Sequence, residues 1–212
     1  MKLYTFFRSS AAYRVRIALN LKGLAYESIP KMLQKNEHRA PEYLALNPHG
    51  LVPALEVNQA TVGQSLAIIE YLDETHPQPP LLPPDPLGRA QVRSMAMAIA
   101  CDIHPLNNLR VLNYLKNPLQ LEQGAVDAWY RHWVNEGFGA LEIQARQHSA
   151  SGRYLHADAV SMADTCLVPQ LFNARRFKVD VSAYPTLLAI GTHLESLPAF
   201  AAARPEVQPE AF

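Results

Sequence analysis

Arg8, Ser9 and Ser10 stand directly before a stretch whose apolar residues recur at helical spacing. The start of a helix presents unpaired N–H groups and a partial positive charge, so it binds anions and favours a thiolate over a thiol. A redox enzyme would place two cysteines here, but the chain has Ser9-Ser10-Ala11-Ala12. A serine hydroxyl can instead donate a hydrogen bond to a thiolate that a ligand supplies. A plain N-cap is the alternative role for either serine.

These side chains need a strand before them and a helix after them. Residues 2–7 are rich in β-forming side chains and predict a strand, and residues 25–30 predict a second one. Between them, the apolar spacing predicts a helix over residues 11–22, which Gly23 ends as a C-cap. The sequence therefore predicts a strand–helix–strand unit.

The next stretch predicts a turn followed by a strand over residues 46–57. Pro53 lies at the start of this strand, and a cis Val52–Pro53 bond is left open. Residues 58–63 predict a hairpin return. A helix is expected over residues 63–77, with Ser65 as its N-cap and His76-Pro77 at its end.

Six prolines in residues 77–86 exclude a regular element and predict a linker. Beyond it the pattern is helical almost throughout, with one long helix expected over residues 89–115, kinked near Pro105. Further helices are expected over residues 127–148 and after the capping-box-like sequence at 161–164, the latter running through Pro169. The predicted fold class is therefore α/β plus all-α.

The composition limits the classes of function. Nineteen basic residues balance nineteen acidic ones among 212, which argues against bulk binding of nucleic acid or an anionic membrane. No apolar run is long enough for a membrane span, and arginines interrupt any signal-peptide pattern near the N-terminus. Cys101 and Cys166 predict two buried free thiols in a cytoplasmic protein. The eight histidines lack the pairing typical of a metal site, so no metal is expected.

The sequence SSAAYRVRIAL resembles the S-S-C-x-W-R-V-R-I-A-L signature of the zeta-class glutathione transferase family. The similarity continues through ALNPHGLVPALEV, GQSLAIIEYLDETHP, PLNNLRVL, SMADTCLVPQ and NARRFKVDV, and so covers essentially the whole chain. Two positions depart from the signature, since Ala11 replaces its cysteine and Tyr13 its tryptophan. Chemistry that needs a protein thiol at position 11 is therefore excluded.

The resemblance implies the glutathione transferase fold, with a thioredoxin-like domain over residues 1–80 and an all-helical domain over residues 87–212 that completes the substrate site. It implies glutathione as the cofactor, a dicarboxylate substrate and a homodimer. The implied reaction is the glutathione-dependent cis–trans isomerisation of a maleyl acid, with maleylpyruvate converted to fumarylpyruvate in the catabolism of aromatic compounds. Isomerisation survives the loss of the motif cysteine because the thiol of glutathione suffices.

The resemblance also assigns roles to residues of the first domain. Ser9 would hydrogen-bond the glutathione sulfur, with Ser10 as the second candidate. The Val52 backbone, ahead of Pro53, would pair with the cysteinyl unit as an added strand does. Gln64 and Ser65 would bind the γ-glutamyl carboxylate.

Four loop or helix residues are expected to complete the ligand site. His38 and His49 are candidates for the glycine carboxylate, with a surface loop position as the alternative. His104 and Asn108 are one helical turn apart, which predicts that they share a helix face. The resemblance implies that this face lines the cleft between the domains and points towards glutathione of the other subunit.

Arginine is the preferred clamp for a carboxylate, because its guanidinium donates two parallel hydrogen bonds. Arg8, Arg110 and Arg176 are the candidates, and Arg175 is expected to point away from the site. Arg14 and Arg16 are assigned to structural pairing. A third cation at Arg110 could favour maleylpyruvate over the longer maleylacetoacetate.

Other readings remain open. The chain could be a maleylacetoacetate isomerase, a conjugating glutathione transferase with a broad range of electrophiles, or a non-catalytic module with this fold. A thiol–disulfide oxidoreductase is disfavoured by Ala11.

Overall fold

The computed structural model describes residues 1–211, which form two compact units. One unit holds Met1–Leu81 together with the segment that begins at Glu195, and the other holds Leu82–Leu194. The segment after Glu195 thus groups with the sheet, which differs from the expected division into residues 1–80 and 87–212. The physical reason is its packing on the first helix, where Asn20 Nδ2 donates to the Ala199 carbonyl at 2.9 Å.

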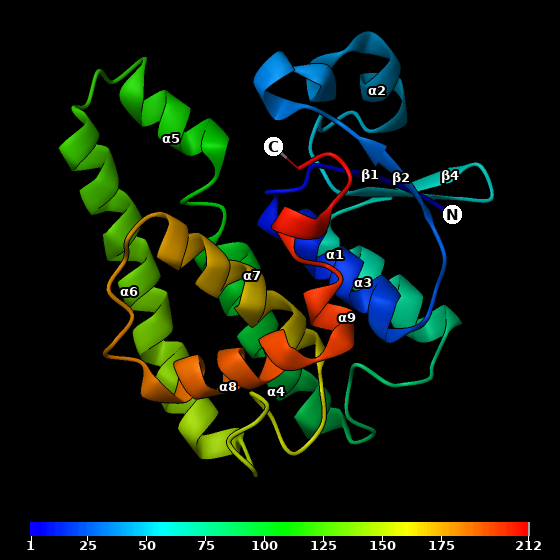
Figure 1. Cartoon of the computed structure of the whole chain (residues 1–212), viewed down its shortest axis with the longest axis vertical. Helices are drawn as coiled ribbons and strands as arrows, with labels where there is room; N and C mark the ends of the chain where they lie inside the picture. The colour runs from blue at the N-terminus through cyan, green and yellow to red at the C-terminus, as the bar shows by residue number, and fades with distance from the viewer. Residues whose placement is uncertain (212) are drawn as a thin grey trace. The chain divides into compact units, whose positions relative to one another are not determined.

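The first unit is built on a four-stranded sheet (Figure 1). Its strands are β1 (Lys2–Thr5), β2 (Glu27–Pro30), β3 (Ala54–Val57) and β4 (Ala60–Gly63). They lie in the order β2-β1-β3-β4, with β1 and β2 parallel and the β1–β3 and β3–β4 pairs antiparallel. A parallel pair needs a crossover, and the helix between β1 and β2 supplies it. The predicted strand–helix–strand unit and hairpin return are confirmed.

Helices cover both faces of this sheet (Figure 1). They are α1 (Ser10–Leu21) and α3 (Ser65–Thr75) on one face and α2 (Pro41–Leu46) on the other, while the short α9 (Pro198–Ala201) packs on α1. Tyr43 of α2 packs with Tyr4 and Ala54, which are cross-strand partners on one face. The neighbouring Thr5 side chain points to the opposite face, where it accepts a hydrogen bond from Arg16 of α1. The period-two alternation of β1 therefore determines which helix covers which face.

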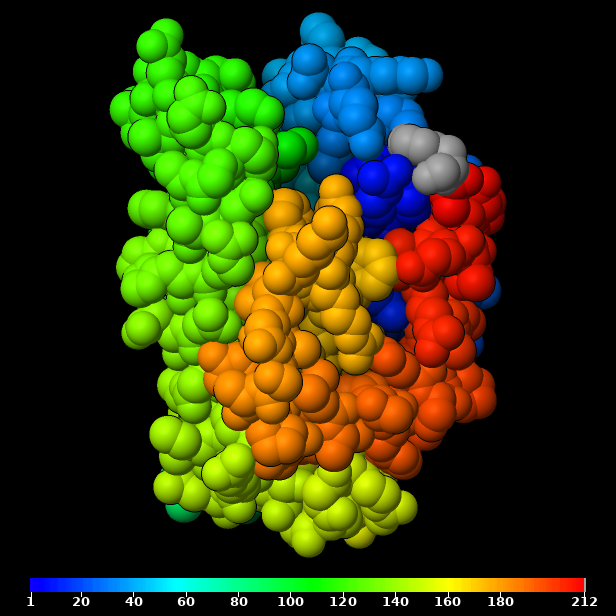
Figure 2. All heavy atoms as spheres, turned by 60° about the vertical axis from the view of Figure 1, so that its left-hand side comes forward, coloured from blue at the N-terminus to red at the C-terminus, as the bar shows by residue number. Residues whose placement is uncertain are grey.

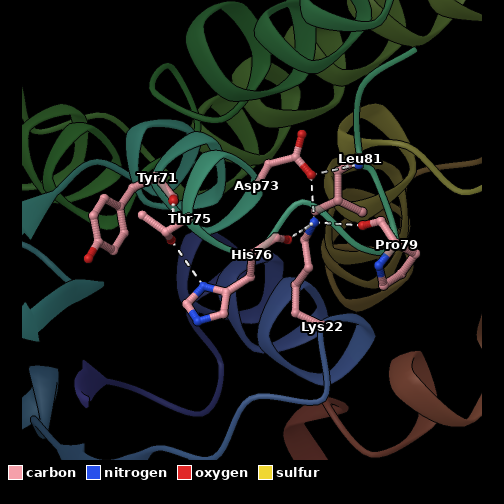
Figure 3. A network of polar contacts seen from close by, with 7 residues as sticks. All are labelled: Lys22, Tyr71, Asp73, Thr75, His76, Pro79 and Leu81. Carbon is pink, nitrogen blue, oxygen red and sulfur yellow. Dashed lines mark hydrogen bonds and ion pairs between the residues drawn. The ribbon is translucent and has the colours of Figure 1, made fainter. Parts of the chain in front are cut away.

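The buried amine of Lys22 holds together the corner where α1 and α3 end (Figure 3). Lys22 Nζ donates to Asp73 Oδ1 at 2.6 Å and to the carbonyl oxygens of His76 and Pro79 at 2.7 and 2.6 Å. Asp73 Oδ1 also accepts from the Leu81 N–H at 2.8 Å. The proline-rich connection after α3 is therefore held in place although it forms no regular element.

The second unit is helical. It contains α4 (Pro86–Met97), a π-helical stretch (Ala98–Ile103), α5 (Leu109–Lys116), α6 (Gln123–His148), α7 (Met162–Arg176) and most of α8 (Pro185–Ser196). The space-filling view shows the side chains of α5 and the first part of α6 (green) at the surface (Figure 2). The capping box at Ser161 and Asp164 is confirmed, as is the passage of α7 through Pro169.

The single long helix expected over residues 89–115 is wrong. The chain widens into the π-helical stretch, turns at residues 104–107 and begins α5 afresh at Leu109. Pro105 has no N–H to continue the helical bonding, and Asn108 caps the new helix instead. Gly137 of α6 makes room for the π-helical stretch, since a Cβ there would lie within 2.3 Å of the Ile103 side chain.

Two further expectations can be compared with the structure. Cys166 is buried as predicted, but Cys101 is exposed, because the π-helical stretch turns it outward. Of the helices in residues 1–211, none has the length and apolarity needed to cross a bilayer.

Candidate active site

Strand register gathers three candidate segments at one end of the sheet. Tyr4 of β1 pairs with Ala54 of β3, and Ala54 pairs with Gly63 of β4. The chain therefore leaves β1 towards Ser9, enters β3 from Val52-Pro53, and leaves β4 towards Gln64-Ser65, all at this same end. These three predicted site segments, although far apart in the sequence, therefore lie at the same end of the sheet.

Ser9 is the N-cap of α1. Its Oγ accepts a hydrogen bond from the Ala12 N–H at 3.2 Å, and its backbone is extended, as N-cap residues require. A hydroxyl that accepts through a lone pair still has its hydrogen to donate, so the cap role and a thiolate-binding role are compatible. Ser10, the first residue of α1, is 4 % exposed, and its Oγ has no hydrogen-bond partner within residues 1–211.

Arg8 directly precedes these serines in the chain, and its side chain is half-buried. Its guanidinium carbon is 4.7 Å from the centre of the Phe7 ring, within the range of a cation–π contact. The aromatic residues that open the motif thus support the side chain of the neighbouring arginine. Arg8 is placed on the same loop as Ser9, which keeps it a candidate for binding a substrate carboxylate.

The loop before β3 holds an open stretch of backbone at Val52. The Val52–Pro53 bond is cis, which answers the question that the sequence left open. Tyr43 Oη and Asn47 Nδ2 both donate to the Leu51 carbonyl, at 2.6 and 2.8 Å, and so fix the residue before Val52. Within the described chain, neither backbone polar group of Val52 is bonded to another backbone group. An extended ligand could pair there as an added strand.

Neither Tyr43 nor Asn47 was predicted to support the site. Asn47 precedes a proline and lies in a turn-forming sequence, which is the one local signal that its side chain would bond to nearby backbone. The contact of Tyr43 has no such signal, because it depends on how α2 packs on the sheet.

His38 lies close to this loop, in a short 3-10 turn (Glu37–Arg39). Gly50 permits the approach, since a Cβ there would meet the His38 carbonyl oxygen at 2.9 Å, and its φ of +56° suits glycine. Burial, and then the charge of Arg39, lower the pKa of His38, so the ring is neutral at pH 7 and can donate from one nitrogen. His49 is exposed.

The start of α3 differs from the prediction. Gln64, not Ser65, is the N-cap, and its side chain makes no capping bond. Its φ of +64° is rare for a residue with a side chain, and such strain is concentrated at functional sites. Ser65 Oγ instead accepts a hydrogen bond from Arg14 Nη1 of α1 at 3.2 Å. The first N–H groups of α3 therefore have no side-chain cap and remain an anion-binding end.

The remaining candidates lie in the second unit, at the two ends of a turn. The expectation that His104 and Asn108 share a helix face is wrong, because the helix ends before His104 and Asn108 starts the next one. Asn108 Oδ1 caps α5 by accepting from the Arg110 N–H at 3.1 Å. The Arg110 side chain is exposed, and so is that of Leu109 beside it.

Arg176 is connected to this turn through an aromatic stack. Its guanidinium carbon is 5.2 Å from the centre of the Phe177 ring, which stacks on Tyr130 of α6 with 3.9 Å between ring centres. The Tyr130 carbonyl in turn accepts from Asn107 Nδ2 at 3.3 Å. Trp129 Nε1 donates to the Leu106 carbonyl at 2.8 Å and fixes the same turn on α6. Asn107 and Tyr130 were not predicted, because their contacts join distant segments.

The described part of the chain contains no group of three or more histidine, cysteine or acidic side chains placed to bind a metal ion. The first unit offers a hydroxyl at the start of α1, an open stretch of backbone at Val52 and a second helix start, that of α3, without a side-chain cap. Such an arrangement can bind an extended anionic peptide-like ligand and stabilise a negative charge near Ser9.

Comparison with known proteins agrees with this geometry. Residues 1–74 match the glutathione S-transferase N-terminal domain family. A probable maleylacetoacetate isomerase of Vibrio cholerae is 51% identical over 211 residues, which span 99% of this chain and 97% of that protein.

Two solved structures superpose closely on the whole chain. One is described as a holo structure of maleyl pyruvate isomerase, a bacterial glutathione S-transferase in the zeta class, with a TM-score of 0.97, 45% identity and full coverage of both chains. The other is maleylacetoacetate isomerase from Methylobacterium extorquens AM1 with bound malonate and GSH, with a TM-score of 0.96, 41% identity and full coverage of both chains.

Proposed function

The chain belongs to the zeta class of the glutathione transferase family, and on that premise we propose that its reaction is the conversion of maleylpyruvate to fumarylpyruvate in aromatic catabolism. It is a glutathione-dependent cis–trans isomerase with a thioredoxin-like N-terminal domain and a helical C-terminal domain. The alternative substrate is maleylacetoacetate, and conjugation of other electrophiles is the alternative activity.

One observation carries the proposal. The strand register brings the Ser9 hydroxyl, the open Val52 backbone and the strained start of α3 to one end of the sheet. A tripeptide with a thiol, two amide groups and a terminal α-carboxylate matches these three features in kind. The residues present therefore fit glutathione, which the family binds.

When bound, glutathione supplies a thiolate that adds reversibly to the maleyl double bond, so that the bond can rotate before the thiolate leaves again. Ser9, with the N–H groups at the start of α1, would favour thiolate over thiol. Val52 would hold the cysteinyl unit by main-chain hydrogen bonds. Gln64 and Ser65 would bind the γ-glutamyl carboxylate at the start of α3. The free protein supplies no thiol at position 11.

The arginines would hold the substrate. Arg8, Arg110 and Arg176 would each donate to a substrate carboxylate from the loop or helix end that bears them. Charge that moves onto the substrate carbonyl during addition would be stabilised by the same cations. His104 and Asn108 would contact glutathione from the turn before α5, and His38 the glycine carboxylate. Three cations suit the shorter, more charge-dense maleylpyruvate.

We further propose a homodimer in the cytoplasm. The family resemblance supports the dimer, and the two free cysteines are typical of a reducing compartment. Light scattering coupled to gel filtration measures the mass directly. A single-chain mass at working concentrations would contradict the dimer without affecting the isomerase function.

The reaction is tested by mixing the protein with maleylpyruvate or maleylacetoacetate and following the ultraviolet change to the fumaryl isomer. We expect turnover only when glutathione is present, with the higher kcat/KM for maleylpyruvate. Turnover at the same rate without glutathione would refute the proposed function. Higher activity with a chloro-aromatic acceptor than with either maleyl acid would favour the conjugating transferase.

A further inference from the structure

Arg14 joins α1 to the start of α3 by a buried hydrogen bond. It lies on α1, its Nη1 donates to Ser65 Oγ at 3.2 Å, and the two residues are 1 % and 7 % exposed. They are 51 positions apart in the sequence, so the contact exists only in the folded unit. Ser65 is the first residue of α3, where the helix N–H groups have no side-chain cap.

The chemistry of the two groups gives this hydrogen bond a direction. A guanidinium only donates, whereas a hydroxyl has one hydrogen and two lone pairs. Because Arg14 occupies a lone pair of Ser65 Oγ, the serine hydrogen is left to donate to another acceptor. A buried cation that donates to the hydroxyl also polarises it and makes it a stronger donor towards an anion.

We propose that Arg14 is a positioning residue that turns the Ser65 hydroxyl hydrogen towards the α-carboxylate of the γ-glutamyl unit and strengthens that hydrogen bond. This rests on the proposed function, because it takes glutathione as the ligand at Ser65. Arg14 affects the ligand through Ser65, so its effect on binding depends on both the serine hydroxyl and the ligand carboxylate. A purely structural arginine would have neither dependence.

Two ligands distinguish a positioning role of Arg14 from a purely structural one. Glutathione has the α-carboxylate, and γ-aminobutyryl-cysteinylglycine lacks only that group while keeping the amine, the thiol and both amide groups. Calorimetric titration gives the Kd of each for the native protein, Arg14→Met, Ser65→Ala and the double variant. Circular dichroism and thermal unfolding establish that each variant is folded.

We expect Arg14→Met to weaken glutathione binding about tenfold, the loss typical of one charge-assisted hydrogen bond. Binding of the analogue should change by less than about twofold. In the Ser65→Ala background, the same substitution should weaken glutathione binding by less than about twofold, because the hydroxyl through which Arg14 acts is gone.

Arg14→Gln provides a second test if Arg14→Met does not fold. Its amide still donates but has no charge, so we expect a smaller loss of about threefold, again for glutathione alone. Equal losses for both ligands, or an undiminished loss in the Ser65→Ala background, would overturn the inference. Failure of the native protein to bind glutathione would instead refute the proposed function, so the two failures are distinguishable.

Discussion

Arg16 Nη2 donates to the carbonyl oxygen of Phe7 at 2.9 Å, immediately before the loop that holds Arg8 and Ser9. The same guanidinium donates to Thr5 Oγ1 and to the Ala203 carbonyl, both at 3.1 Å. Burial lowers the pKa of Arg16 to about 10, which leaves it charged at pH 7. One fully buried cation therefore joins the end of β1, the Ser9 loop and the C-terminal segment.

Replacing Arg16 should affect both stability and chemistry. We expect Arg16→Met to lower the free energy of unfolding by about 3 kcal/mol, because three acceptors lose a charged donor. The pKa of the bound glutathione thiol, read from thiolate absorbance, should rise as the Ser9 loop loosens. Asn20→Ala is the control, since it releases Ala199 of the same C-terminal segment without touching the loop. Equal thiol pKa values in both variants would contradict a role for Arg16 in positioning the loop.

Ser9 and Ser10 should differ in their effects. Ser9→Ala is expected to reduce kcat/KM about 100-fold, as when a donor to a reacting anion is lost. The free energy of unfolding should fall by about 1 kcal/mol, because the N-cap of α1 is lost as well. Ser10→Ala removes a buried hydroxyl without a partner in residues 1–211, so stability should be unchanged or slightly higher. Steady-state kinetics and urea unfolding measure both. Loss of activity in Ser10→Ala alone would transfer the donor role to Ser10.

Arg110 is expected to determine substrate preference. Arg110→Ala should raise KM for maleylpyruvate about tenfold and that for maleylacetoacetate by less, since one carboxylate contact is lost where charge is most dense. Arg175→Ala is the matched control, because Arg175 is an exposed arginine of the last turn of α7 to which no substrate contact is assigned. An unchanged ratio of kcat/KM for the two acids in Arg110→Ala would remove Arg110 from the site.

Lys22 and Lys2 provide a test of burial. Both form an ion pair with an acidic side chain, but the Lys22 side chain is 0% exposed and that of Lys2 is 46% exposed. Lys22→Met should cost about 3 kcal/mol of unfolding free energy because Asp73 and two carbonyls lose their buried donor. Lys2→Met, which breaks the surface pair with Glu56, should cost less than about 1 kcal/mol. Similar costs in urea unfolding would show that the buried position contributes nothing.

Asp164 should make stability depend on pH. Burial raises its pKa to about 6, against the opposing effect of hydrogen bonds from the Leu155 and Ser161 N–H groups. A raised carboxyl pKa means that the folded state binds the proton more tightly than the unfolded state, whose value is near 4. This contribution is therefore complete below about pH 4 and is lost as the pH rises through about 6. Comparing unfolding free energies of native protein and Asp164→Asn across this range isolates it. A difference that grows in favour of the native protein with rising pH would contradict the raised pKa.

Local patterns predicted the first unit well. The strands, the helix after Ser9 and the end of α3 at His76 each follow from alternation, helical spacing or a turn-forming residue close by in the sequence. Ser65 was misassigned as an N-cap because its hydroxyl is used by Arg14, a residue that no local pattern connects to it. The order of the strands was likewise beyond local evidence, since pairing of β1 with β3 joins residues far apart in the sequence.

The second unit shows where spacing alone misleads. Residues 89–115 have helical spacing throughout, yet the α-helix gives way to the π-helical stretch at Ala98. At the other end of that stretch, Ile103 packs against Gly137 of α6. The widened turn also exposes Cys101, which spacing had placed inside. The grouping of α9 with α1 depends on tertiary contacts in the same way.

The burial of Lys22 also determines how its amine reacts with chemical reagents. Three acceptors surround its ammonium group and its side chain is 0% exposed, so a reagent in solution does not reach the nitrogen in the folded state. An acylating reagent can react with the five other lysines of the chain, none of which is buried, while Lys22 remains unmodified. The rate at which Lys22 is acylated would therefore report how often this corner of the fold opens by local unfolding.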